Sequence, residues 1–157
     1  GWVHDENASL LGGISGNAGL FGTADDLAII MQMFVQNGQY AGKRYISENT
    51  LADFTRVQYP DNENRRGLGF DKPYLNNNQF TLADSYPAPE VSASSFGHSG
   101  FTGTFVWADP AQQLVYIFLS NRVYPTRNNR NIYDLNIRSS IQQIFYQAFD
   151  NVKQHKP

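Results

Sequence analysis

A pair of β-rich segments late in the chain constrains its fold more than any other feature. Residues 102–108 and 114–120 are rich in β-branched and aromatic side chains, and the Asp-Pro-Ala-Gln sequence at 109–112 has the composition of a turn. The two segments therefore predict an antiparallel hairpin. Residues 114–119 are apolar without alternation, so we expect both faces of the second strand to be covered, as in a central strand.

Three helices are predicted around this hairpin. Thr23 is followed three positions later by Asp26, an acidic variant of the capping box, and apolar residues then recur at helical spacing up to Gly38. Ser47 begins a shorter helix that extends to residue 54. A final helix should pack on the sheet through an apolar stripe made up of Ile137, Ile141, Ile144, Phe145 and Ala148. Helices packed against an antiparallel sheet define an α+β fold.

The remaining segments are predicted to be mostly irregular. Residues 1–22 contain five closely spaced glycines from position 12 onward and read as a tightly turned segment. Residues 67–70 are compatible with a short strand. Residues 84–95, with two prolines and several serines, are interpreted as a surface loop.

Composition excludes several classes of function. The chain has 157 residues, the size of one domain, and its 12 basic and 14 acidic residues are well mixed, so no nucleic-acid partner is expected. The absence of cysteine excludes disulfides, a thiol nucleophile and a Cys-ligated metal. His4, His98 and His155 lie far apart without ligand spacing, and we expect neither a metal nor another cofactor.

Residues 96–104 carry the strongest functional signal, because three glycines surround a histidine and a serine directly before a predicted strand. Glycine lets a ligand approach the backbone, and unpaired N–H groups at a strand edge can bind an oxyanion. His98 would supply a proton donor or a switchable charge. A structural interpretation stays open: a histidine in the turn that enters the strand, with its ring bonded to a backbone carbonyl.

No recognisable nucleophile is present. Ser99 lacks the second glycine of a nucleophile elbow, because Phe101 occupies that position, and no serine has a lysine three residues later. Residues 74–76 (Tyr-Leu-Asn) match an acid/base motif only superficially and are interpreted as a loop. The arginines and asparagines of residues 121–131 could bind an anion or a sugar, but a solvated loop explains them better.

The order of these segments resembles the serine β-lactamase-like family, which includes class C β-lactamases, D-alanyl-D-alanine carboxypeptidases and related esterases. Residues 16–28 resemble the family's G-x-x-S-T-A-x-D-L-A segment, and residues 97–103 resemble its third motif, Lys-Thr-Gly or His-x-Gly, on the strand that lines the active site. Residues 107–110 and 119–122 fit the hairpin that follows, and the last helix fits the family's C-terminal helix. The resemblance covers nearly the whole chain and implies a partial β-lactamase/transpeptidase-like fold.

The resemblance also implies roles for four residues. His98 would line the substrate site and hold a substrate carboxylate or assist proton transfer, and Ser99 would hydrogen-bond substrate. Gly100 would permit close approach, and the backbone N–H of Phe101 would be one of two oxyanion donors. Histidine in place of lysine points toward peptidase- or esterase-like members, because histidine is largely neutral at pH 7.

The family's Ser-x-x-Lys and Tyr-x-Asn motifs lie upstream of the segment where this chain begins. We therefore expect residues 1–157 to be a C-terminal portion of one domain, inactive alone, with the N-terminal half as its missing partner. The parent would act on a D-alanyl peptide, a β-lactam or a small ester, in the periplasm or outside a bacterial cell. The alternative is a non-catalytic module that binds peptidoglycan or a partner. An exposed strand edge should also favour self-association.

Overall fold

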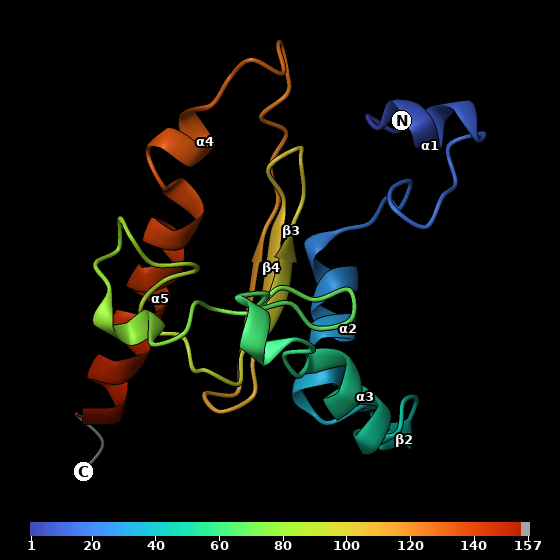
Figure 1. The fold of residues 1–157 in the computed structure, drawn as a ribbon. Coiled ribbons are helices and arrows are strands. Elements are labelled where there is room, and N and C mark those ends of the chain that lie inside the picture. The colour runs from blue at the N-terminus through green and yellow to red at the C-terminus, as the bar shows by residue number, and fades with distance from the viewer. Residues whose placement is uncertain (155–157) are drawn as a thin grey trace.

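A three-stranded antiparallel sheet lies between two long helices in the computed structural model, which describes residues 1–154 and so leaves His155 outside (Figure 1). The strands β3 (Phe96–Ser99), β4 (Phe105–Asp109) and β5 (Leu114–Phe118) are ordered β3-β4-β5. Helix α2 (Ala24–Val35) covers one face of the sheet and α5 (Ile137–Gln154) covers the other. The α+β architecture predicted from the sequence is confirmed.

The predicted hairpin is confirmed, but its first strand begins later and its second strand ends earlier, at Phe118, than predicted. Strands β4 and β5 pair in antiparallel register from Phe105–Phe118 to Asp109–Leu114. Residues 102–104 do not extend β4, because they belong to the turn that joins it to β3. Gly103 has a φ of +102° in that turn, a conformation that favours glycine.

Strand β5 was predicted to be covered on both faces and to be a central strand; the first prediction is confirmed and the second is wrong. Val115 packs against the cluster formed with α2, and Tyr116 packs against Tyr146 of α5, so both faces are covered. Within residues 1–154, however, β5 is an edge strand and not a central one. An apolar run without alternation indicates that both faces of a strand are buried. It does not indicate whether both edges of the strand are hydrogen-bonded to neighbouring strands.

The first two predicted helices are confirmed, including their caps. Thr23 accepts a hydrogen bond from the amide of Asp26 (3.2 Å), and the Asp26 carboxylate accepts one from the amide of Thr23 (2.9 Å). Gly38, with a φ of +86°, follows the end of α2. Ser47 caps α3 (Glu48–Thr55), and the two-residue strands β1 (Gln39–Tyr40) and β2 (Lys43–Arg44) lie between these helices.

The apolar stripe predicted for the last helix is only partly correct. Ile141 packs against the core, but Ile144 is 63% exposed and Phe145 is 54% exposed. The most deeply buried side chains of α5 are instead Gln142 and Tyr146, which are polar. Both are buried because they hydrogen-bond distant residues, the backbone of Ala88 and the carboxylate of Asp109, so hydrophobic periodicity could not identify them.

The predictions of a surface loop at residues 84–95 and of a short strand at residues 67–70 are wrong. Residues 84–95 form a loop, but a buried one, in which Ala88, Val91 and Ser95 are almost fully inaccessible. Residues 67–70 form a bend and no strand; Gly69 has a φ of +78°, and the bend places the Phe70 ring 5.0 Å from the Phe96 ring. The segment is apolar because Phe70, in this bend, packs against the sheet.

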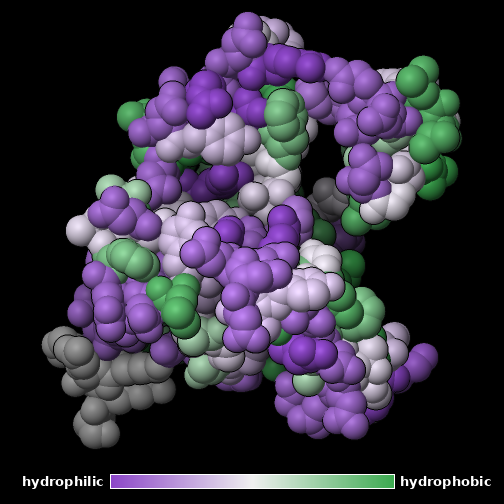
Figure 2. Space-filling view, viewed as in Figure 1, coloured by the Kyte–Doolittle hydropathy of each residue, from purple (hydrophilic) through white to green (hydrophobic). Residues whose placement is uncertain are grey.

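The N-terminal segment contains a short helix, α1 (Glu6–Leu10), that the glycine-rich pattern concealed. It lies apart from the sheet in Figure 1, and Figure 2 shows hydrophobic side chains gathered over it. The remaining elements are the short helices Pro60–Asn62, Asn77–Gln79 and α4 (Asn131–Asp134). None of the helices among residues 1–154 combines the length and apolar character needed to cross a membrane.

Candidate substrate-binding strand

His98 lies on strand β3 itself and not in a turn that enters a strand. Side chains alternate along β3, so His98 shares the α2 side of the sheet with Phe96, whereas Gly97 faces the opposite side with Trp107. A Cβ atom on Gly97 would lie 2.1 Å from the carbonyl oxygen of Val106 and 2.4 Å from the Trp107 ring. Close packing between β3 and β4 therefore requires this glycine.

The outer edge of β3 is paired at one end and open at the other. Gly97 exchanges two backbone hydrogen bonds with Asp71, of 2.7 and 3.0 Å. Backbone groups two residues apart face the same edge, so the amide of Ser99 points outward beside this bridge. The amide N–H of Phe101 donates to no other group in residues 1–154. The edge thus offers polar backbone groups to a ligand at residues 99–101.

A tight turn sets the position of the Phe101 amide. Gly100 donates to the carbonyl of Thr104 (2.8 Å), and Gly103 donates to the carbonyl of Gly100 (3.0 Å). A Cβ on Gly100 would lie 2.3 Å from the Thr104 hydroxyl. Packing within the turn thus requires glycine at position 100, whatever else Gly100 does for a ligand.

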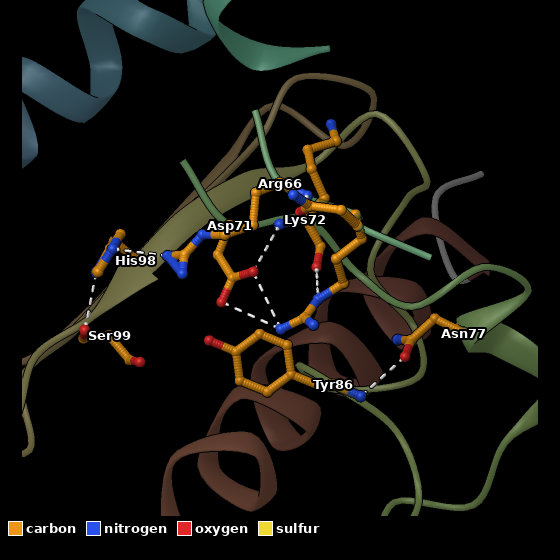
Figure 3. Close-up of polar contacts among 9 residues, drawn as sticks. Arg66, Asp71, Lys72, Asn77, Tyr86, His98 and Ser99 are labelled. Atoms are coloured by element: carbon orange, nitrogen blue, oxygen red, sulfur yellow. Dashed lines mark hydrogen bonds and ion pairs between the residues drawn. The ribbon is translucent and has the colours of Figure 1, made fainter. Parts of the chain in front are cut away.

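The exposed ring of His98 is held at both nitrogens (Figure 3). Nε2 lies 2.9 Å from Nη2 of Arg66, and Nδ1 lies 2.8 Å from the carbonyl oxygen of Ser99. A guanidinium can only donate hydrogen bonds, so Nε2 is the acceptor and the ring proton is on Nδ1. His98 is therefore neutral in this arrangement, and Nδ1 donates to Ser99. The backbone-carbonyl contact anticipated for a structural histidine is present, together with a contact to a charged residue.

A second group of charged and aromatic side chains lies next to the outer edge of β3, around Asp71. Arg65 bonds the buried carboxylate of Asp71 at 3.0 Å and lies against the neighbouring rings of Tyr74 and Tyr86, 4.8 and 4.9 Å from their centroids. The Tyr86 hydroxyl lies beside Asp71 and Ser99. Burial, reinforced by the negative charge of Asp71, raises the pKa of Tyr86 to about 12, so this phenol stays protonated at neutral pH.

The side chain of Phe101 is 58% exposed and is contacted by residues far from it in the sequence. Arg122 stacks 4.4 Å from the Phe101 ring and donates to the Phe101 carbonyl (2.7 Å), and the His4 ring stacks on the same phenylalanine at 5.5 Å. Arg122 also bonds the carbonyls of Arg127 and Asn129. Its guanidinium thus organises the loop at 121–131, in agreement with the structural interpretation of that segment.

The chain matches the Beta-lactamase family over residues 1–138. It belongs to that family. Among curated relatives, two proteins named "Putative D-alanyl-D-alanine carboxypeptidase", from Salmonella enteritidis PT4 and Salmonella newport, are each 36% identical over 140 residues. Those alignments cover 85% of this chain and 30% of each relative. A crystal structure of a beta-lactamase from Mycobacterium bovis superposes with a TM-score of 0.59 at 22% identity, over 82% of this chain and 44% of that one.

These findings show that the chain is part of a beta-lactamase-like domain, as the order of its motifs implied. It spans less than a third of the length of the relatives from Salmonella. The structure adds three residues near β3 that sequence reasoning did not single out, namely Arg66, Asp71 and Tyr86. None of them belongs to a short motif, and they reach β3 only through the fold. No cluster of metal-ligating side chains occurs in the described part of the chain.

Proposed function

We propose that this chain forms one wall of an acyl-transfer site in a longer D-alanyl-D-alanine carboxypeptidase. The observation that carries the proposal is the free amide of Phe101 at the open end of the β3 edge. An N–H group aimed at a site without a protein acceptor can stabilise the oxyanion of a tetrahedral intermediate. The nucleophile residue of the parent would supply the second donor.

The neighbouring residues then bind and orient the substrate. The outward backbone groups of Ser99 pair with an extended peptide in the manner of an added strand. The Ser99 hydroxyl and the His98 ring flank that backbone from opposite faces of β3. Gly100 leaves the approach to the Phe101 amide unobstructed by a side chain. Each role follows the family resemblance and uses the strand geometry described above.

The chain by itself should be catalytically inactive. Activation of a serine nucleophile requires a base within hydrogen-bond reach of the hydroxyl. Lys72 donates to the carbonyl of Ser94, and Lys43 lies over the Tyr45 ring, so neither of these lysines activates a serine hydroxyl. We therefore place the nucleophile and its base in a part of the parent outside these 157 residues.

A D-alanyl peptide is the favoured substrate, because the relatives that share 36% of the aligned residues are named for D-alanyl-D-alanine cleavage. A β-lactam or a small ester would use the same oxyanion donor and the same strand edge. We place the parent in the periplasm or outside the cell of a bacterium, where cell-wall peptides occur.

Covalent labelling tests this proposal. The chain and its full-length parent are each incubated with a fluorescent penicillin and with an activated phosphonate, and the adducts are located by mass spectrometry. Labelling of the parent alone, at a serine outside these 157 residues, is the expected result. Labelling of the isolated chain would refute its inactivity, with Ser99→Ala as the first control. If neither is labelled, the alternative of a non-catalytic peptidoglycan- or partner-binding module replaces the enzyme.

A further inference from the structure

Two consecutive arginines beside β3 have opposite electrostatic surroundings. The charge of Arg65 is neutralised by the buried carboxylate of Asp71, and its guanidinium lies against two tyrosine rings. Arg66 forms no ion pair with any carboxylate in residues 1–154. The contact of its guanidinium within the described chain is the 2.9 Å hydrogen bond to Nε2 of His98, made through Nη2. Its Nε and Nη1 donors therefore remain available.

This contact determines what His98 can do. Arginine is protonated at all relevant pH values and has no acceptor atom, so it can bond Nε2 only when that nitrogen is unprotonated. The second contact, from Nδ1 to the carbonyl of Ser99, requires a proton on Nδ1. Both contacts are satisfied by a single neutral tautomer. A doubly protonated ring would instead place two donors face to face at 2.9 Å.

We propose that Arg66 is a positioning and specificity residue: it holds His98 in the neutral Nδ1–H tautomer and itself carries the permanent positive charge at the open edge of β3. In this arrangement His98 orients the guanidinium, and the remaining donors of Arg66 bind a carboxylate or a similar anionic group of the substrate. The substrate role rests on the proposed function. The tautomer and the anion site do not, because both are properties of this chain.

The tautomer is tested by ¹⁵N NMR of the imidazole nitrogens in the chain labelled at histidine. In the wild-type chain, Nε2 of His98 should have the shift of an unprotonated nitrogen and Nδ1 that of a protonated one. Arg66→Met should move His98 toward an exchanging mixture of tautomers, and Arg66→Lys, which retains a donor, should restore much of the wild-type spectrum. Arg130→Met removes an exposed arginine elsewhere and should change nothing at His98. A protonated Nε2 in the wild type, or an unchanged spectrum in Arg66→Met, would overturn the proposal.

The anion site is tested with acetate as the probe. Titration at constant ionic strength and pH should shift the His98 ring signals of the wild-type chain in a saturable way. Arg66→Met should lose at least ~10-fold in apparent affinity, whereas Arg130→Met should bind as the wild type does. Equal responses of Arg66→Met and wild type would show that the charge lies elsewhere. Because neither experiment requires turnover, failed labelling of the parent would reject the proposed enzyme without deciding the role of Arg66.

Discussion

The hydroxyl of Tyr146 donates a 2.8 Å hydrogen bond to Oδ2 of Asp109, and this contact joins the middle of helix α5 to the end of strand β4. Asp109 is completely buried and also accepts bonds from the amide and the hydroxyl of Ser92 and from the amide of Gln112. Burial, together with the charge of Asp109, raises the pKa of Tyr146 well above its ordinary range. One carboxylate thus connects the hairpin, the buried loop and the last helix.

Removing this carboxylate should be among the most destabilising single changes in the chain. Asp109→Ala removes the acceptor that four donors share, one of them buried and three half-buried, and we expect a loss of at least ~3 kcal/mol in the free energy of unfolding. Tyr146→Phe removes one donor and leaves the others paired, so about 1 kcal/mol should be lost. Urea unfolding followed by circular dichroism measures both. Similar losses of unfolding free energy in the two variants would show that the bonds of Asp109 to Ser92 and Gln112 contribute little to stability.

Stability should rise with pH between 8 and 10. Burial lowers the pKa of Lys72 from its ordinary 10.5 to about 8, so in this window the unfolded chain binds a proton that the folded chain has released. Folding is then favoured as pH increases, with a slope of at most about 1.4 kcal/mol per pH unit. Lys72→Met should abolish the rise.

Above pH 10 the trend should reverse. The folded-state pKa values of Tyr86 and Tyr116 are raised to about 12, chiefly by burial, so the unfolded chain loses these protons first. We therefore expect the free energy of unfolding to be greatest near pH 10, and chemical unfolding at a series of pH values measures it. A flat profile from 8 to 10 in the wild type would contradict the burial of a charged Lys72.

The two kinds of glycine in this chain should respond differently to alanine. Gly97→Ala forces a Cβ against the Val106 carbonyl and the Trp107 ring, and we expect a loss of about 2–3 kcal/mol or failure to fold. Gly16 has open space around its Cβ position and no positive φ, so Gly16→Ala should change stability by less than about 0.5 kcal/mol. Thermal unfolding of both variants tests this. Tolerance of alanine at position 97 would mean that β3 and β4 can separate.

In the full-length parent, His98→Ala should slow acylation by at least ~10-fold, because it removes the group that orients Arg66 beside the substrate. Stability should fall by no more than about 1 kcal/mol, since the His98 ring is exposed. Stopped-flow acylation by a chromogenic substrate and thermal unfolding separate the two effects. Unchanged kinetics would exclude His98 from the site.

The isolated chain should self-associate through the free edge of β5. Four consecutive residues of this strand, 114–117, line a groove of about 180 Å³ together with Phe145 of α5. An unpaired apolar strand edge is a template for pairing with a second chain. Phe145→Glu places a charge at the groove and should lower the oligomer fraction, whereas Leu75→Glu, at an exposed position outside the groove lining, should not. A wild-type monomer over a wide concentration range in light scattering would contradict the prediction.

Local sequence signals predicted the parts of the structure that are determined locally. The cap at Thr23 and the turn between β4 and β5 depend on contacts within a few residues; the cap formed as expected, and the turn lies at residues 110–113, one residue later than predicted. The buried face of α5 could not be predicted in this way, because Gln142 is buried and bonded to Ala88, which is 54 residues away in the sequence. The contact between Arg66 and His98 spans 32 residues and is equally invisible to a motif search. The family motif located His98, and only the fold identified its partner.

The bridge between Asp71 and Gly97 limits how far an extended ligand can run along β3. Asp71 already occupies the backbone groups of Gly97 on the outer edge, so a peptide paired with Ser99 has no free position beyond it in that direction. The outer edge of β3 is therefore closed to a ligand at Gly97 and open at Ser99. A ligand paired with Ser99 must therefore end or turn away from β3 there, because the segment that contains Asp71 occupies the next position along the edge.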